Sequence, residues 1–510
     1  MNTDDRHIEV YGFDTNKEAV NSSRQRLNSL FPSTTLYLEV GNFLEFVIHN
    51  YGLNGMPDLF KPLEPVMFDL IIANPPYVRT QILGAQQAQS LAKRFDLTGR
   101  IDLYYAFILG MECVLKKEGT AGIIVSNRFM TTKSGKSIRK AIRENCNIKH
   151  VWDLGDTKLF DAAVLPAILL IEGKHRQTCE PPNFTSIYET DHEGNICVPH
   201  PIAALEKQGV IKVKDGRNFR VQHGKLSTTD GSPDEVWRIT TDKVNTWLST
   251  VKSHTWGLFG DIGEIRVGVK TCADKVFIRK NWYDFPEQER PELLRPLATH
   301  HIARQFKADT SKSVYYILYP YEVTQGKRTV VDLNKYPISK TYLEYHRSTL
   351  EGRKYVIKAG RKWYEIWVPQ DPSAWSNPKL VFRDIAEEPT FWLDYDGSVV
   401  NGDCYWMICK PSVSPELLWL ATAIGNSRFI ELFYDHSFHN KLYSGRRRFI
   451  TQYVEKFPLP NPDNSTSRKI IEKCKEIYNR IPSEDTRSMK KELDSLIWNA
   501  FGMTEPSIKD

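Results

Sequence analysis

The stretch from Phe68 to Tyr77, Phe-Asp-Leu-Ile-Ile-Ala-Asn-Pro-Pro-Tyr, places an amide, a carbonyl group and an aromatic ring next to one another. Its first half is a short apolar run with β-branched residues, which predicts a buried strand that ends at the two prolines. Pro75 has a fixed φ and no N–H donor, and Pro76 keeps Pro75 out of the helical region. The backbone after Asn74 is therefore stiff and extended. In open α/β sheets, ligands bind at this carboxyl end of the strands.

These groups suit the chemistry of an adenine amine, whose nitrogen is a poor nucleophile because its lone pair is delocalised into the ring. The side-chain oxygen of Asn74 and the carbonyl oxygen of Pro75 could accept hydrogen bonds from its two N–H groups. A tetrahedral nitrogen aimed at a methyl donor would result, through positioning and preorganised electrostatics. Tyr77 would stack on the base, which must leave a duplex to reach such a pocket. A proline turn that closes a core strand is the alternative interpretation.

The sequence Asn74-Pro75-Pro76-Tyr77 resembles the catalytic motif of amino-methyltransferases that use S-adenosylmethionine. These include adenine-N6 DNA methyltransferases and some RNA and glutamine methyltransferases. The resemblance implies catalytic roles for all four residues and requires no metal. In the adenine methyltransferases that this chain resembles, a later aromatic residue packs against the flipped base, and Phe160 is the candidate here. A hydrophobic plug under a turn is the alternative for Phe160.

The elements before the motif are expected to hold the cofactor. Residues 8–14 and 36–40 read as strands, and residues 17–30 read as a helix. A carboxylate at the end of the second strand of a dinucleotide-type fold accepts from a ribose hydroxyl. Asp14 has this place, with a helix N-cap as the alternative. Asn42 stands where the resembling family usually has an acid that binds the adenine amine of the cofactor, and an amide oxygen can accept the same bond.

Three apolar residues are expected near the adenine ring of the cofactor. Phe43 follows Asn42 and could pack against this ring. Leu103 and Phe107 are four residues apart and share a helix face, and the resemblance implies that both line the adenine pocket. Core packing is the alternative for all three residues.

A Rossmann-like site also needs a first strand and a glycine-rich turn, so that the backbone can approach the ligand. No such loop precedes Asp14 in this sequence. We therefore expect an N-terminally truncated domain. A partner chain could supply the missing cofactor-binding segment, or a nuclease.

The second half of the chain resembles the target-recognition domain of TaqI-like adenine methyltransferases, including Eco57I-type restriction–modification enzymes. The marks are Gly-Asp-Ile…Gly-Val-Lys-Thr near residue 260, Asn-Pro-Lys near 377, Asn426-Ser427 and Lys456–Pro460. Residues 256–271 are expected to form a twisted hairpin or bulged sheet. Aromatic residues interleaved with cations suit contacts with phosphates and bases. The candidates for DNA contacts are Lys270, Arg361, Lys362, Lys441, Arg446, Arg447 and Arg448.

A length of 510 residues allows two or three domains, and a net charge of +6 permits a polyanionic partner without requiring one. The eight cysteines lack the spacing of a zinc site, and no apolar run is long enough to span a bilayer, so a cytoplasmic location is expected. The expected fold is α/β. A partial Rossmann-like methyltransferase domain would occupy residues 1–175, a connector 176–240, a mixed α+β recognition domain 241–462, and a helical tail that docks on another chain 463–510.

Three functions follow from these residues. The first is an S-adenosylmethionine-dependent adenine-N6 methyltransferase that acts on duplex DNA in a restriction–modification system. The second is a non-catalytic DNA-recognition subunit, which the absence of the glycine-rich loop favours. The third is methylation of RNA or of a protein glutamine, which the long basic and aromatic second domain disfavours.

Overall fold

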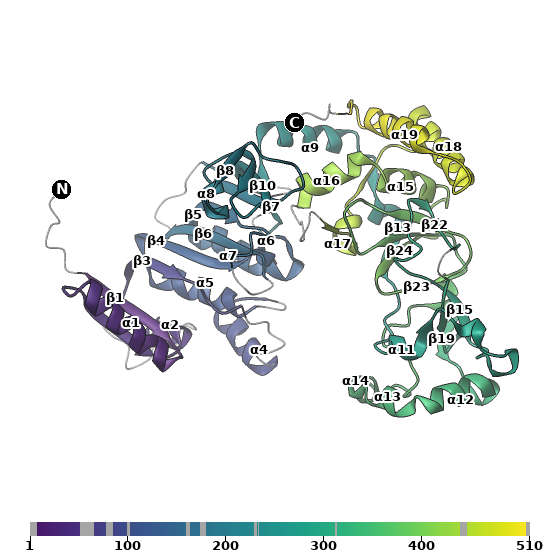
Figure 1. Ribbon diagram of the computed structural model, residues 1–510, viewed down its shortest axis with the longest axis horizontal. Coiled ribbons are helices and arrows are strands. Elements are labelled where there is room, and N and C mark those ends of the chain that lie inside the picture. The colour runs from purple at the N-terminus through teal and green to yellow at the C-terminus, as the bar shows by residue number, and fades with distance from the viewer. Residues whose placement is uncertain are drawn as a thin grey trace. The chain divides into compact units, whose positions relative to one another are not determined.

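The computed structural model describes residues 8–51, 66–77, 85–98, 102–159, 164–173, 180–228, 232, 234–311, 314–438 and 446–505. The chain divides into two compact units, residues 1–240 and 241–510, and each unit has hydrophobic core clusters of its own (Figure 1). Within the described ranges, no helix is both long enough and apolar enough to cross a membrane.

The first unit is a mixed α/β structure. Its helices are α1 (Lys17–Leu30), α2 (Phe43–Tyr51), α4 (Ala85–Arg94), α5 (Leu103–Val114), α6 (Arg128–Thr131), α7 (Lys136–Asn145) and α8 (Pro201–Ala204). Its strands are β1 (Glu9–Asp14), β2 (Thr35–Val40), β3 (Phe68–Ala73), β4 (Leu115–Ser126), β5 (Cys146–Asp153), β6 (Pro166–Gly173), β7 (Asn183–Glu189), β8 (Ile196–Val198), β9 (Gly209–Val213), β10 (Asn218–Thr228) and β11 (Trp237–Thr240). The strands and the helix predicted before the motif are confirmed as β1, α1, β2 and β3.

The described strands of the first unit form two sheets. β1 and β2 are a parallel pair. The nine strands β3 to β11 form one mixed sheet in the order β3-β4-β6-β5-β7-β10-β9-β8, with β11 on β10. The region expected as a connector or subdomain, residues 176–240, therefore contributes β7 to β11 to the same sheet.

One face of this sheet is buried under α5 and α7. In β4, Ala121, Ile123 and Val125 alternate toward this face and are fully buried in the core cluster that both helices join. In β3 the opposite face is open, because the side chains of Leu70 and Ile72 are 63% and 84% exposed. The core thus supports the carboxyl ends of β3 and β4 from one side.

The sequence Lys116-Lys117-Glu118-Gly119 predicts a helix that ends near residue 119, but this is wrong, because α5 ends at Val114 and β4 already begins at Leu115. Leu115 pairs with Phe68, so the residues after α5 are drawn into the sheet by a strand far away in the sequence. Gly119 is required at this crossing. A Cβ atom there would lie 2.7 Å from the carbonyl oxygen of Phe68. Tertiary pairing overrides the local helix signal.

The second unit combines small sheets with helices. Its strands are β12 (Gly257–Leu258), β13 (Gly263–Val267), β14 (Ile278–Arg279), β15 (Leu294–Ala298), β16 (Phe306–Lys307), β17 (Tyr315–Leu318), β18 (Tyr321–Thr324), β19 (Lys327–Val330), β20 (Lys379–Arg383), β21 (Ile385–Ala386), β22 (Phe391–Asp394), β23 (Val399–Val400), β24 (Cys404–Cys409), β25 (Arg447–Arg448) and β26 (Pro458–Leu459). Its helices are α9 (Asp242–Ser253), α10 (Phe259–Ile262), α11 (Asp274–Phe277), α12 (Pro337–Tyr345), α13 (Arg347–Glu351), α14 (Lys354–Lys358), α15 (Leu417–Gly425), α16 (Arg428–Phe438), α17 (Thr451–Val454), α18 (Ser465–Arg480) and α19 (Arg487–Ala500).

The hairpin expected over residues 256–271 is not present. β12 pairs with β26 and β13 pairs with β24, so both partners are distant in the sequence. The main five-stranded sheet has the order β13-β24-β20-β22-β16. Within this sheet, β20 and β22 pair in the antiparallel direction.

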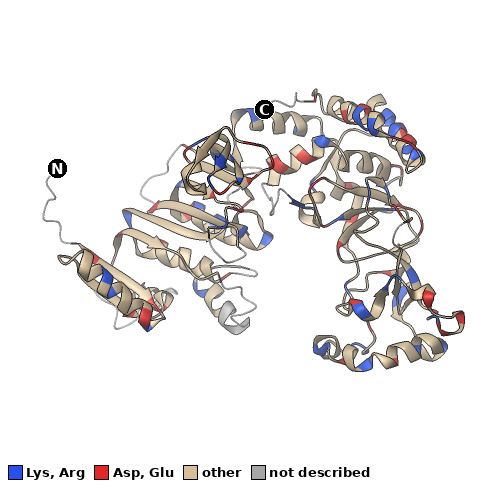
Figure 2. Ribbon diagram, in the orientation of Figure 1, with Lys and Arg blue, Asp and Glu red and all other residues tan. Residues whose placement is uncertain are grey.

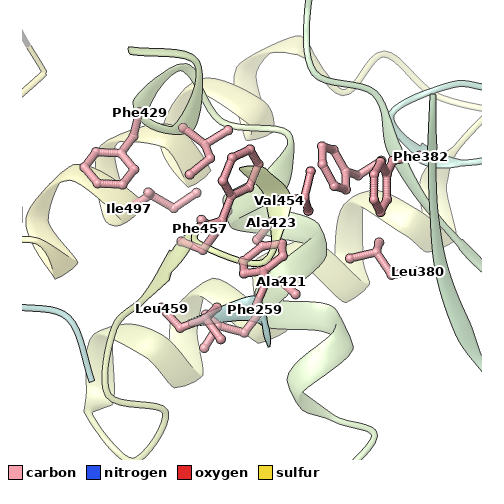
Figure 3. Close-up of a cluster of buried hydrophobic side chains, with 14 of the residues drawn as sticks. Phe259, Leu380, Phe382, Ala421, Ala423, Phe429, Val454, Phe457, Leu459 and Ile497 are labelled. Carbon is pink, nitrogen blue, oxygen red and sulfur yellow. The ribbon is translucent and has the colours of Figure 1, made fainter. Parts of the chain in front are cut away.

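The two terminal helices, α18 and α19, pack on the core of their own unit, whereas the sequence led us to expect docking on another chain. Ile470, Ile477 and Leu493 are buried in the same cluster as Phe259 and Phe457. Figure 3 shows this cluster, with Ile497 of α19 beside aromatic side chains from other elements. The apolar faces of α18 and α19 are thus satisfied within the chain.

Candidate active site and DNA interface

The Asn-Pro-Pro-Tyr motif lies directly after β3, as its sequence predicts. Asn74 is exposed, Pro75 is buried and Tyr77 is half-buried. The Tyr77 hydroxyl lies 2.8 Å from Asn74 Oδ1 and 3.3 Å from the carbonyl oxygen of Ile124 in β4. Burial raises the pKa of Tyr77, so its hydroxyl keeps its proton at neutral pH. The motif thus presents an oriented amide and an aromatic ring at the rim of the sheet.

A cavity of about 570 Å³ lies at the carboxyl ends of three strands. Asp14 ends β1, Gly41 and Asn42 follow β2, and Asn74 follows β3. The residues that line it are Tyr11, Gly12, Phe13, Asp14, Thr15, Gly41, Asn42, Phe43, Phe68, Leu70, Ile71, Ile72, Ala73, Asn74, Pro75, Pro76, Phe107 and Met111. The structure therefore brings four of the five predicted cofactor residues to one cavity with Asn74, Pro75 and Pro76, whereas Tyr77 is not among the residues that line it.

Asp14 and Asn42 also stabilise the loops that carry them. Asp14 Oδ1 accepts a hydrogen bond of 2.7 Å from the backbone N–H of Asn16. Asn42 Oδ1 accepts one of 3.0 Å from the N–H of Leu44, at the start of α2. An oxygen has two lone pairs, so these contacts leave room for a ligand hydroxyl or amine. The N-cap of α1 is Asn16, whose Oδ1 accepts from the N–H groups of Glu18 and Ala19, so the cap alternative for Asp14 was wrong.

Aromatic rings form an apolar wall beside these polar groups. Phe43 and Phe107 stack with ring centroids 5.9 Å apart, and Phe13 lies 5.7 Å from Phe43. Leu103 instead packs against the buried core cluster, and it is not among the residues that line the cavity. Sequence reasoning missed Phe13 and Met111. Their signals were present, because Met111 is one helical turn after Phe107 and Phe13 directly precedes Asp14.

A buried polar network joins the ends of β4, β5 and β7. Asp153 Oδ1 accepts a bond of 2.9 Å from Asn127 Nδ2, and its Oδ2 accepts one of 2.7 Å from the Tyr188 hydroxyl. Burial raises the pKa of Asp153, and the bonds from Tyr188 and Asn127 oppose this rise. The network anchors the turn at Gly155, which has a φ of +46°. Phe160, the predicted base clamp, lies outside the described residues.

In the second unit, three of the predicted DNA contacts lie in one region. Lys270 forms a backbone bridge with Val368, and the Arg361 guanidinium lies 5.0 Å from the ring centre of the neighbouring Trp367. Arg361 also donates to the carbonyl oxygen of Trp367 at 2.6 Å. The side chains of Lys270 and Lys362 are exposed. These cations are therefore available on the surface, with Arg361 fixed beside an aromatic ring.

The neighbouring helices add charge and apolar surface to this region. α13 begins with Arg347, and α14 begins and ends with a lysine (Figure 2). Lys354 and Lys358 of α14 are exposed, and so are Tyr355 (43%) and Ile357 (44%). The ring of Tyr355 meets that of Trp367 edge-on at 4.9 Å. We call this region, residues 354–362 with Lys270 and Trp367, the basic aromatic surface.

The three consecutive arginines differ in their environments. Arg447 is buried (7% exposed), and its guanidinium binds Asp435 at 2.7 Å and Glu431 at 2.8 Å. Arg446 is exposed and lies 3.7 Å from Glu387. Arg448 is half-exposed and paired with Asp384 at 3.1 Å. The buried ion pairs of Arg447 favour a structural role for it.

Lys441, the remaining predicted DNA contact, lies outside the described residues.

Two of the sequence marks in this unit have structural roles. Lys379 is fully buried and donates to the carbonyl oxygen of Trp375 at 2.7 Å. Asn426 holds the backbone of Phe391 through both side-chain atoms, accepting at 2.9 Å and donating at 2.8 Å. These contacts explain why the fold needs both residues.

Comparison with known proteins identifies the family. A model described as the Eco57I restriction-modification methylase matches residues 9–160, and one described as the TaqI-like C-terminal specificity domain matches residues 324–459. The chain is 40% identical to the type II methyltransferase M.BanIII of Aneurinibacillus aneurinilyticus, across 98% of this chain and 87% of that protein. It is 25% identical to M.BstVI of Geobacillus stearothermophilus, across 98% and 85%.

Among solved structures, the type IIL restriction–modification enzyme MmeI in complex with DNA has a similar fold. The TM-score is 0.59 at 12% identity, across 95% of this chain and 60% of that one. The chain belongs to the type II DNA methyltransferases of restriction–modification systems, with an Eco57I-type methylase region and a TaqI-like specificity domain. It is a site-specific DNA methyltransferase of an S-adenosylmethionine-dependent family, and DNA is the substrate class of this family.

Proposed function

We propose that this chain transfers a methyl group from S-adenosylmethionine to the N6 amine of a flipped adenine in a specific duplex site. The observation that carries the proposal is that Asn74 and Pro75 share one cavity with Asp14 and Asn42. A group that can hold an amine and groups that can hold a nucleoside are therefore neighbours.

In this proposal the motif holds the target base. Asn74 Oδ1 and the Pro75 carbonyl accept hydrogen bonds from the adenine amine, while the ring of Tyr77 and Phe160 contact the base. S-adenosylmethionine supplies an electrophilic methyl group on a sulfonium. The new N–C bond forms as the C–S bond breaks, and the amine then releases one proton to solvent. Of the four residues, Pro76 acts only by fixing the backbone.

The donor set on the opposite wall fits S-adenosylmethionine. The Asp14 carboxylate can accept from ribose hydroxyls, and Asn42 Oδ1 can accept from the adenine amine of the cofactor. Phe43 and Phe107 offer ring faces for its adenine, and Leu103 supports the wall from the core. No cation is required at any of these positions.

We expect Asp14→Ala to weaken S-adenosylmethionine binding roughly 10-fold to 100-fold, because hydrogen bonds to a carboxylate are stronger than neutral ones. Isothermal calorimetry on the purified chain measures this. Glu39→Ala is the matched control, since Glu39 is an exposed acid in β2 away from the cavity. Absence of cofactor binding with retained duplex binding would favour the alternative, a non-catalytic DNA-recognition chain.

The described strands that border the proposed cofactor site belong to two separate sheets. Among the described residues, β1 pairs only with β2, and β3 pairs only with β4, although both β1 and β3 border the cavity. Unpaired backbone groups on a strand edge are a template for another strand. The exposed Leu70 and Ile72 of β3 leave apolar surface beside this edge.

We therefore infer that a strand from outside the described residues completes the site and contributes a glycine-rich turn near the cofactor. A partner chain is one source of this strand. Hydrogen exchange tests the inference. About half of the backbone amides of β1 and β3 point away from β2 and β4. We expect these amides to be protected from exchange only when the completing strand is present. Equal protection in the absence of that strand would contradict the inference.

The basic aromatic surface is proposed to contact DNA, together with Lys441, Arg446 and Arg448. We expect Lys362→Ala to lower the slope of log K against log salt by about 0.9, because each phosphate contact releases roughly that many counterions. Fluorescence anisotropy with a duplex across a salt series measures the slope. Lys469→Ala, an exposed lysine of α18, is the control and should leave the slope unchanged.

The proposed reaction is tested by incubating the chain with methyl-labelled S-adenosylmethionine and a mixed-sequence duplex, followed by nucleoside digestion. The expected product is labelled N6-methyldeoxyadenosine. Label in cytosine instead would overturn the assignment of the target base.

A further inference from the structure

The Tyr77 hydroxyl has a contact that stacking on a base does not require. It lies 2.8 Å from Asn74 Oδ1, three residues earlier in the same motif. Within the part of the chain that the structure describes, its other hydrogen-bond neighbour is the carbonyl oxygen of Ile124, at 3.3 Å. Both neighbours are acceptors only, so the hydroxyl must be the donor in this arrangement.

The position of the ring limits the hydroxyl to this region. Tyr77 is half-buried, and the ring of Tyr104 meets it edge-on with centroids 6.4 Å apart. Tyr104 is itself buried and donates to the carbonyl oxygen of Ser126 in β4 at 3.4 Å. The phenol is therefore supported from the core side, while Asn74 is exposed.

The orientation of the Asn74 amide matters for the proposed reaction. Its Oδ1 can accept from the adenine amine, whereas its Nδ2 can only donate and would repel the N–H groups. A hydroxyl that donates to Oδ1 selects one of the two orientations. Oδ1 keeps a second lone pair, which remains available to the substrate.

We propose that the Tyr77 hydroxyl is a positioning group that holds the Asn74 carboxamide with its oxygen oriented for the target amine. This inference rests on the proposed adenine methylation and adds a second role for Tyr77, separate from stacking. The ring face contacts the base, and the hydroxyl at the ring edge sets the orientation of the residue that accepts the amine hydrogen.

The test is Tyr77→Phe, which keeps the ring and removes the hydroxyl. We expect single-turnover methyl transfer to fall about fivefold to tenfold, as the loss of one hydrogen bond implies, with KM for duplex DNA within twofold. Tyr104→Phe is the matched control. It also removes a phenol hydroxyl, one that donates to the backbone carbonyl of Ser126 in β4, the strand that contains Ile124. This control should leave the rate of transfer unchanged.

A second background separates orientation from general structural damage. A carboxylate presents an oxygen in either orientation, so in Asn74→Asp the hydroxyl has nothing to select. In the Asn74→Asp background, we expect Tyr77→Phe to lower the rate of methyl transfer less than twofold. An equal loss in both backgrounds, or no loss in the native background, would overturn the inference.

A further measurement does not depend on activity. If the hydroxyl binds Asn74, the effects of Tyr77→Phe and Asn74→Ala on urea unfolding should be non-additive by about threefold in the equilibrium constant. Additive effects would also overturn the inference. Failure of the proposed function would look different, since the native chain would then form no N6-methylated adenine at all.

Discussion

Asn74→Ala should lower the rate of methyl transfer at least 100-fold while duplex binding stays within about twofold, a loss typical of removing one preorganised group from a reaction centre. Asn74 is exposed at the end of β3, and no core packing depends on it. Its side-chain oxygen is, in our proposal, the group that makes the adenine nitrogen nucleophilic. Labelled methyl transfer and fluorescence anisotropy measure the two quantities separately.

Asp69→Ala is the matched control for this variant. Asp69 is also an exposed polar residue of β3, where it pairs with Lys116 at 2.8 Å, and it does not line the cavity. Surface ion pairs contribute little to stability, so this variant should retain full activity. Equal losses of activity and DNA binding in Asn74→Ala would show that the residue is structural.

Arg447→Ala should destabilise the second unit by about 1–3 kcal/mol, because it removes the buried guanidinium that pairs with the partly buried carboxylates of Asp435 and Glu431. Urea unfolding followed by tryptophan fluorescence measures this loss. Arg446→Ala is the matched control, and its exposed side chain predicts a change below about 0.5 kcal/mol. Native stability combined with weaker DNA binding in Arg447→Ala would instead make Arg447 a DNA contact.

The pH dependence of the Arg447→Ala variant provides an independent check. Burial already raises the pKa of Glu431 in the native chain, and Arg447 opposes that rise. Without the arginine, the folded state should bind protons more readily than the unfolded state. Stability is then gained as pH falls toward the raised pKa and lost as pH rises through it. The variant should therefore recover part of its stability as the pH falls from neutrality toward 4.5, the ordinary pKa of a glutamate.

The three arginines show why a run of like charges is ambiguous. Side chains alternate between faces along an extended chain, so neighbours in such a run cannot share one environment. In β25 and the residue before it, Arg446 and Arg448 point to solvent and Arg447 points into the unit. A phosphate-binding role remains open for the outer two, and the contacts of the middle one are within the protein.

The sequence by itself determined the elements that carry the candidate site. The strands that end at Asp14 and Ala73 and the helix over residues 17–30 depend on local patterns: apolar runs, a capping residue and two consecutive prolines. β1 and β2 pair in parallel, so the ends that carry Asp14 and Asn42 lie at one edge of their sheet. β3 belongs to the other sheet, and the tertiary structure brings Asn74 to the same cavity.

Tertiary structure decided the features that depend on distant partners. Leu115 joins a strand because Phe68 pairs with it, and β13 pairs with residues 404–409 instead of closing a hairpin. The apolar faces of α18 and α19 meet the core of the second unit, a destination that an amphipathic pattern does not specify. The Tyr77–Asn74 hydrogen bond belongs to the same group, because it depends on how β4 and α5 support the phenol ring. Local sequence sets the conformation of a segment, but contacts between segments determine which side chains are buried, paired or free to bind.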